Sequence, residues 1–286
     1  MTDSDSLISL DLEPEEINGP VVLLFLDSWG VAPLSDGNAF TDLNLKNLNQ
    51  FLDNYPVTIL SASGEPGERY RILGAEGQLT TLISKAGLKQ RRLSESEATP
   101  FLEAYFLNGR SELITGESRE VVSSSAGERQ EDFEQAGQIL VKKLVSAIKK
   151  GEDNFIILSL SNLDLAAASG NFEKTKETLK TFDSWLQKIS DTLFKYRGTL
   201  ILTSAYGRAE ALLNPSSGLA QTSITSNPVP FLIISQAHAG QTIGSDVLSE
   251  DLSLLSPSTD LSAVAPTILS LLNIKIPGDF PGKKLL

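Results

Sequence analysis

The chain has 286 residues, enough for one large α/β domain or two small ones, and its 41% hydrophobic and 21% charged residues are ordinary values for a soluble globular protein. The formal net charge of −12 and the pI near 4.6 argue against nucleic acid and anionic membrane surfaces as partners. Cysteine is absent and histidine occurs once, as His238, which excludes disulfides, thiolate metal sites and a multi-histidine metal centre built by this chain alone.

The first segment, residues 1–18, carries six acidic residues and no basic one, so we interpret it as a solvated, mobile tail. It has no basic region followed by an apolar stretch, the pattern of a secretory signal. No apolar run in the chain approaches the roughly 20 residues that cross a bilayer. We therefore expect a cytoplasmic protein without a membrane or nucleic acid partner.

Short apolar runs bounded by turn residues follow the tail and predict strands buried on both faces of a parallel sheet. These predicted strands are Val21–Leu26, Val57–Ser61, Phe155–Leu160, Leu200–Thr203 and Phe231–Ile234.

Apolar residues at three- and four-residue spacing predict helices over 132–150, 172–196 and 262–272. Strands that alternate with helices predict an α/β fold of three layers, with a mostly parallel sheet and helices on both of its faces. The sequence has no internal repeat and no long linker, so we expect residues 19–286 to form a single domain.

Several segments at the predicted strand ends match one known family. LDSWG (Leu26–Gly30) resembles that family's LDGWG, and SNLDLAAASGN (Ser161–Asn171) is similar to its NPDMVGHTGN. TSAYGRAE (Thr203–Glu210) resembles TADHGNAE, and QTSITSNPVPFLI (Gln221–Ile233) resembles HTAHTTNPVPFIL. On this resemblance, which runs in order over about residues 20–286, the chain is identified as a member of the cofactor-independent phosphoglycerate mutase family. The resemblance implies an alkaline-phosphatase-like core.

The first departure from this family concerns a second domain, which the family inserts into the core shortly after its nucleophile motif to grip the phosphoglycerate. Here Ile59–Gly64 is followed after about fifteen residues by LTTLISKAGLKQ, which leaves no room for that insert. The nucleophile motif GNSEVGH has no counterpart in Gly67–Gln78, which contains no serine. We interpret Gly64–Glu68 as a turn across the deletion.

The second departure concerns two divalent metal ions, which the resemblance implies are held by Asp and His side chains. Carried over position by position, only Asp27 and Asp164 remain as candidate ligands. The other former ligand positions hold residues that do not coordinate metal in this way: Ala168, Ala205, Tyr206, Gln221 and Ile224. We therefore expect no cofactor, or at most one weakly bound Mg²⁺ or Mn²⁺ at the two carboxylates.

The leading hypothesis is a pseudoenzyme that acts as a scaffold or binds an unknown protein partner, or associates with itself. The rival is a repurposed metal-dependent phosphatase or phosphotransferase that uses Asp27 and Asp164. A third possibility is a subunit whose partner supplies the missing residues.

Simpler interpretations of the same residues remain open. Asp27 and Asp164 are also of a type that braces the turns after strands. Arg208 and Glu210 are expected to form ion pairs, with each other or with Asp27, and His238 is interpreted as an exposed loop residue.

Overall fold

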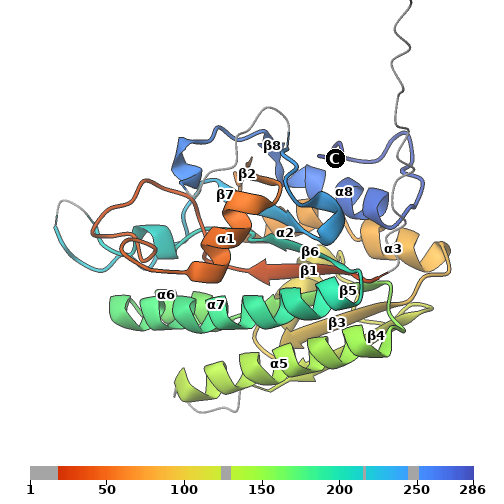
Figure 1. The fold of residues 1–286 in the computed structure, drawn as a ribbon, viewed down its shortest axis with the longest axis horizontal. Coiled ribbons are helices and arrows are strands. Elements are labelled where there is room, and N and C mark those ends of the chain that lie inside the picture. The colour runs from red at the N-terminus through yellow and green to blue at the C-terminus, as the bar shows by residue number, and fades with distance from the viewer. Residues whose placement is uncertain (1–18, 124–129, 215–216, 244–250) are drawn as a thin grey trace, which may run out of the picture.

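The computed structural model describes residues 19–123, 130–214, 217–243 and 251–286 (Figure 1). The acidic segment 1–18, predicted to be a mobile tail, lies outside the described residues. All strands of the described residues belong to one sheet of eight, in the order β4-β3-β5-β1-β6-β7-β2-β8. The strands are β1 Val21–Leu26, β2 Val57–Ser61, β3 Gln90–Glu95, β4 Glu117–Val122, β5 Phe155–Leu160, β6 Thr199–Thr203, β7 Val229–Ile234 and β8 Thr259–Asp260.

The sheet is mostly parallel, as predicted. β1 pairs in parallel with β5 on one side and with β6 on the other, and only β7 runs antiparallel to its neighbours, β6 and β2. All six residues of β1 are completely buried. An apolar run without alternation is typical of a strand that is covered on both faces.

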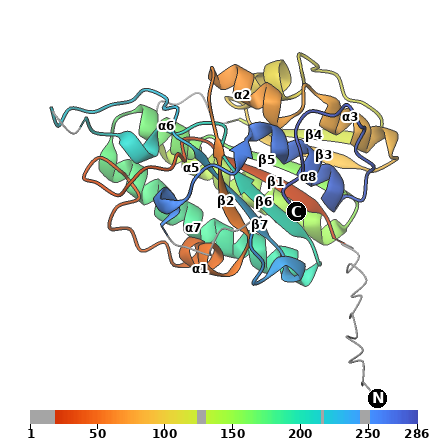
Figure 2. The same ribbon diagram turned by 90° about the horizontal axis from the view of Figure 1, so that it is seen from above.

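Helices cover both faces of the sheet, which confirms the predicted three layers (Figures 1 and 2). Residues of α1, α5, α6 and α7 pack in one apolar cluster, and residues of α2, α3 and α8 pack in the other. The helices are α1 Lys46–Asn54, α2 Pro66–Leu73, α3 Gln78–Lys85, α4 Thr99–Phe101, α5 Gln130–Lys150, α6 Asn162–Ala168, α7 Phe172–Lys195 and α8 Val264–Leu271.

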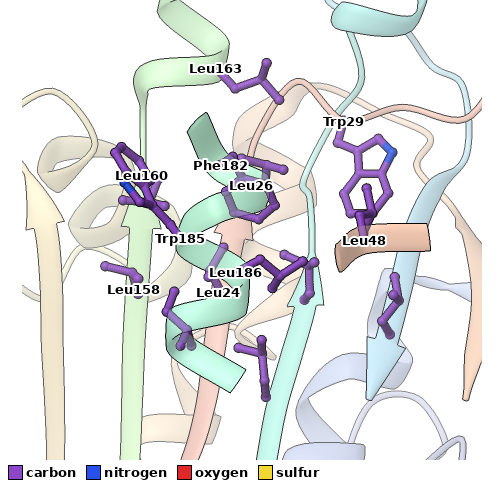
Figure 3. Close-up of a cluster of buried hydrophobic side chains, with 14 of the residues drawn as sticks. Leu24, Leu26, Trp29, Leu48, Leu158, Leu160, Leu163, Phe182, Trp185 and Leu186 are labelled. Atoms are coloured by element: carbon purple, nitrogen blue, oxygen red, sulfur yellow. The ribbon is translucent and has the colours of Figure 1, made fainter. Parts of the chain in front are cut away.

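The largest helix, α7, covers the centre of the sheet. Figure 3 shows Phe182 and Leu186 of α7 against Leu24 and Leu26 of β1. The side-chain amide oxygen of Asn171 accepts a hydrogen bond from the Lys174 amide, which caps the first turn of the helix. Of the helices in the described residues, none is long and apolar enough to cross a membrane.

Two strands at one side of the sheet, β3 and β4, have no apolar run that predicts them. Arg92 in β3 is 2% exposed, and its Nε lies 2.9 Å from a carboxylate oxygen of Glu117 in β4. Arg110 lies 2.5 Å from the other oxygen of Glu117. Buried charges are tolerated in a strand when they are paired, so these strands depend on partners that local sequence does not reveal.

The segment Gly64–Glu68 was predicted to be only a turn, and this interpretation is partly wrong. Gly64 has a φ of +89°, as a turn residue does, but the helix α2 begins two residues later at Pro66. Proline suits the first turn of a helix because its missing amide hydrogen is not needed there. The short connection therefore leads into a helix that packs in the apolar cluster on one face of the sheet.

Candidate functional site

The candidate site lies where three neighbouring parallel strands end. Asp27 follows β1, Tyr206 follows β6, and Asp164 lies in α6, which begins directly after β5. The carboxyl ends of parallel strands meet at one edge of a sheet, where the loops that follow them build most sites in open α/β folds. Residues 27, 164 and 206 are therefore brought together although they are far apart in the sequence.

Asp27 is 5% exposed, and both of its carboxylate oxygens have a partner within the chain. Oδ1 accepts a hydrogen bond of 3.0 Å from the backbone amide of Ala205, and Oδ2 accepts one from the hydroxyl of Tyr70 in α2. Burial raises the pKa of Asp27 to about 7, although the two hydrogen bonds oppose this shift. Near neutral pH the group is therefore a mixture of carboxylic acid and carboxylate.

Asp164 also has partners within the chain. Its Oδ1 accepts a hydrogen bond of 2.5 Å from the hydroxyl of Ser28 and lies 3.1 Å from Nε of Arg208. Tyr206 is 8% exposed beside both carboxyl groups, and burial, followed by the nearby charges of Asp27 and Asp164, raises the pKa of its phenol. The cationic partner of Asp164 is thus an arginine of this chain.

Ser28 has an unusual backbone conformation for a residue with a side chain. Its φ is +76°, in the left-handed region that favours glycine, and glycine stands at this position in the LDGWG motif of the related family. Ser28 is completely buried, and its hydroxyl group is directed to Asp164. The chain therefore keeps a turn suited to glycine and uses the added side chain to bind a carboxylate.

Two substitutions separate the effects of this backbone conformation and of the hydrogen bond. Ser28→Ala removes the bond to Asp164 and keeps a Cβ at positive φ, so we expect it to destabilise the protein by about 1–3 kcal/mol. Ser28→Gly removes the same hydrogen bond but also removes the cost of holding a Cβ at positive φ. We therefore expect this variant to be about 1 kcal/mol more stable than Ser28→Ala. Urea unfolding of both variants at pH 7 measures the difference. Equal stability of the two variants would contradict the assigned backbone cost.

Glu210 holds the loops around the site together. It is 2% exposed and accepts hydrogen bonds from the Gly30 amide at 3.2 Å, from the Asn227 side chain at 2.9 Å and from the Thr225 hydroxyl. The prediction that Arg208 and Glu210 pair with each other or with Asp27 is wrong in detail. Arg208 pairs with Asp164, and Glu210 is held by uncharged donors because it lies on a short 3₁₀ turn that faces the Gly30 loop.

Four further positions, which the sequence resemblance assigns to metal ligands, hold Ala168, Ala205, Gln221 and Ile224. Ala205 is buried, and its backbone amide donates the hydrogen bond to Asp27, whereas Ala168 is exposed at the end of α6. The backbone amide of Gln221 donates to the Leu212 carbonyl oxygen, and Ile224 packs against the cluster that contains Tyr70 and Tyr206.

His238 lies away from these residues and is not the exposed loop residue that the sequence predicted. It is half-buried in a short 3₁₀ turn after β7, and its Nδ1 lies 2.6 Å from the Ser235 hydroxyl. Burial lowers the pKa of its imidazole.

Sequence reasoning missed Tyr70, Ser28 and Arg208 as the partners of the two carboxyl groups. The serine in LDSWG was a signal, because it replaces a glycine of the related motif. Nothing in the sequence around Tyr70 indicates that its hydroxyl group reaches Asp27. Among the described residues, no group of three or more His, Cys, Asp or Glu side chains is arranged to hold a metal ion.

The chain is similar in sequence to proteins of known family. A 2,3-bisphosphoglycerate-independent phosphoglycerate mutase from Antithamnion sp. is 33% identical over 209 residues, which cover 73% of this chain and 39% of that protein. The protein of the same name from Picosynechococcus sp. is 30% identical over 248 residues, or 86% of this chain and 44% of the relative. The chain therefore spans about two fifths of the length of these relatives.

Solved structures show the same fold. The Leishmania mexicana phosphoglycerate mutase, crystallised at low cobalt concentration, matches 74% of this chain and 38% of its own with a TM-score of 0.59 at 21% identity. Alkaline phosphatase from the Antarctic bacterium TAB5 matches 90% of this chain and 99% of its own with a TM-score of 0.58 at 12% identity. These structures confirm the predicted alkaline-phosphatase-like core. Since the model of the Metalloenzyme superfamily matches residues 19–276, the chain belongs to this superfamily and is related to the cofactor-independent phosphoglycerate mutases.

Proposed function

We propose that this chain is a pseudoenzyme: a member of the superfamily that has lost metal-dependent phosphoryl transfer and acts by binding a protein partner. The observation that carries the proposal is that internal donors occupy the two carboxyl groups left from the metal centre. Fold similarity by itself does not decide activity, so the proposal depends on the residues of the site.

The donor set does not fit two divalent ions. A metal ion at Asp27 competes with the Tyr70 hydroxyl for Oδ2 and with the Ala205 amide for Oδ1. At Asp164 it competes with the guanidinium of Arg208, which repels a second cation. A pKa of about 7 also means that a metal ion must displace a proton from Asp27 at neutral pH.

The segment that replaces the nucleophile motif supports the same conclusion. α2 places Tyr70 against Asp27, and burial, together with the nearby Asp27, raises the pKa of this tyrosine well above its ordinary value. A phenol that does not ionise is a poor nucleophile. Gly67–Gln78 contains no serine that takes its place, and the direct connection from β2 to α2 leaves no substrate-gripping insert.

A metal titration tests this proposal. We expect the full chain to bind Mn²⁺ or Mg²⁺ no more tightly than about 1 mM, the weak end of carboxylate sites in proteins. At 0.1 mM neither ion is then expected to shift the melting temperature measurably. A ligand stabilises a protein according to the ratio of its concentration to its Kd, and this ratio is only about 0.1 here. A chelator is likewise expected to leave the melting temperature unchanged. Elemental analysis of the purified protein and calorimetric titration provide the measurements.

A matched variant shows whether the internal donors are the cause. Tyr70→Phe combined with Arg208→Ala frees one oxygen of Asp27 and removes the cation beside Asp164, so we expect Mn²⁺ affinity to rise. The rival enzyme predicts a stoichiometric metal ion and turnover of phosphoglycerate or a generic phosphomonoester that Asp27→Ala abolishes. Either of these results in the unaltered chain would overturn the proposed loss of chemistry.

A further inference from the structure

A cavity of about 320 Å³ opens beside the candidate site. Trp29 and Gly30, which directly follow Asp27 and Ser28, form part of its wall, and Leu48 and Leu52 of α1 form another part. None of the carboxyl or phenol groups of the candidate site lines this cavity. We call the cavity and its rim the Trp29 groove; its lining combines apolar side chains such as Trp29, Leu48 and Leu52 with polar ones such as Asn38, Asp42 and Asn49.

One wall of the Trp29 groove consists of buried apolar side chains. The ring of Trp29 stacks on that of Phe40 with a centroid distance of 5.8 Å, and Figure 3 shows Trp29 beside Leu48 of α1. Trp29 is 3% exposed, so its ring is fixed by the fold. A fixed apolar floor reduces the entropy that binding costs.

The rim of the Trp29 groove exposes large apolar side chains. Leu34 is 61% exposed, and Leu254, which follows the lining residue Ser253, is 76% exposed. A single exposed leucine is common on a protein surface. Leu34 lies on the rim and Leu254 just outside the lining, so a partner that covers the cavity can also cover these two side chains.

The charge of the Trp29 groove indicates the chemistry of its partner. Among the residues that the structure describes, its lining includes the acidic residues Asp42 and Asp251 and contains no lysine, arginine or histidine. Asp42 is exposed, whereas Asp251 caps the turn that follows it by accepting from the Ser253 amide. Acidic side chains around an apolar cavity favour an apolar ligand flanked by basic groups, because complementary charge speeds association and rejects acidic competitors.

From these observations we propose that the Trp29 groove binds an amphipathic segment of another protein, which inserts one or two large apolar side chains and carries lysine or arginine around them. The proposal deepens the partner-binding role proposed above and rests on it. A volume of about 320 Å³ is at the lower end of ligand cavities, which suits side chains of a docked helix better than a free cofactor.

Two other occupants are disfavoured by charge. The chain's own residues 1–18 contain Leu7, Ile8, Leu10 and Leu12, but six acidic residues surround these apolar side chains and would meet an acidic rim. A second copy of the chain brings a further net charge of −12 to the contact. Like charges at an interface oppose association.

The test uses a fluorescent helical peptide about 16 residues long, with leucine and tryptophan at i, i+3, i+4 and i+7 on one face and lysine on the other. Two control peptides keep the length: one has the same composition in scrambled order, and one has glutamate in place of lysine. We expect fluorescence anisotropy to show binding of the amphipathic basic peptide to the full chain at least about 10-fold tighter than either control.

Variants of exposed residues locate the binding. Leu34→Ser combined with Leu254→Ser is expected to weaken binding about 10-fold, and Asp42→Asn about 2-fold with a smaller salt dependence. Leu219→Ser is the matched control, because Leu219 is 69% exposed and does not line the groove. It is expected to leave binding unchanged, and circular dichroism checks that every variant is folded.

Four results would overturn this proposal. The first two are equal affinity for the basic and acidic peptides and no effect of the double leucine variant. The third, much tighter binding after deletion of residues 1–18, would identify the chain's own tail as the occupant. The fourth, a dimer in sedimentation that the double leucine variant dissociates, would identify a second copy instead. The metal titration of the same preparation separates the two proposals, because failure of the peptide to bind leaves the loss of phosphoryl transfer standing.

Discussion

Replacing Glu95 by glutamine is expected to stabilise the protein by about 3–5 kcal/mol at pH 8.5 and by less than about 1 kcal/mol at pH 5. Glu95 is the last residue of β3 and is completely buried. Its Oε1 accepts one weak hydrogen bond of 3.4 Å from the Ser161 amide, and its Oε2 has no hydrogen-bond partner among the described residues. Burial therefore raises the pKa of Glu95 to about 8.

The sign of this effect follows from where the proton is bound. Below pH 4.5 Glu95 is protonated in both the folded and the unfolded chain, so burial of a charge costs nothing. Between pH 4.5 and about 8 the unfolded chain releases the proton while the folded chain retains it, so stability falls as the pH rises. Above pH 8 the whole cost is present, and glutamine, which resembles the protonated acid in shape, avoids it.

Urea unfolding of wild type and Glu95→Gln at pH 5, 7 and 8.5 measures the effect. Asp27, whose raised pKa acts in the same direction, is present in both proteins, so the difference between the two curves isolates Glu95. Glu152→Gln is the control, because Glu152 is exposed and does not contribute to the shifted pKa of Glu95, and it is expected to change stability by less than about 0.5 kcal/mol. Parallel curves for wild type and Glu95→Gln would contradict the raised pKa.

Replacing Glu210 by alanine is expected to destabilise the protein by about 3–5 kcal/mol, because a buried carboxylate that binds several donors is removed and the donors stay buried. The Gly30 amide and the Asn227 and Thr225 side chains lose their acceptor together. Glu210→Gln is expected to cost less, since one carbonyl oxygen remains. Chemical unfolding compares the two variants, and a loss below about 1 kcal/mol for alanine would contradict the assigned role.

A coupled substitution tests the packing around the same carboxylate. A Cβ added at Gly207 would clash with Oε1 of Glu210 and would lie 2.6 Å from Oγ1 of Thr225, so Gly207→Ala is expected to destabilise the wild type. In the Glu210→Ala background the first of these clashes disappears. We therefore expect the double variant to be at least about 1 kcal/mol more stable than the sum of the single effects predicts. Strict additivity would show that Glu210 relaxes away from Gly207 without cost.

The fold was predictable where a strand is apolar throughout. Val21–Leu26, Val57–Ser61 and Phe155–Leu160 were predicted with the bounds that the structure has. β3 and β4 were missed because residues such as Arg92 and Glu117 satisfy one another across the pair, and the sequence of either strand alone is that of a polar loop.

The sequence by itself determined the family and which residue stands at each position that the resemblance assigns to metal ligands or nucleophile, since both depend only on the order of residues. Only the tertiary structure decided what Asp27 and Asp164 contact. Ser28 and Asp164 are 136 positions apart, and Tyr70 and Asp27 are 43 apart. Hydrogen bonds and burial act between atoms that folding brings together. The hydrogen bonds to Asp27 and Asp164 and the groove beside Trp29 therefore appear only when strands and helices pack.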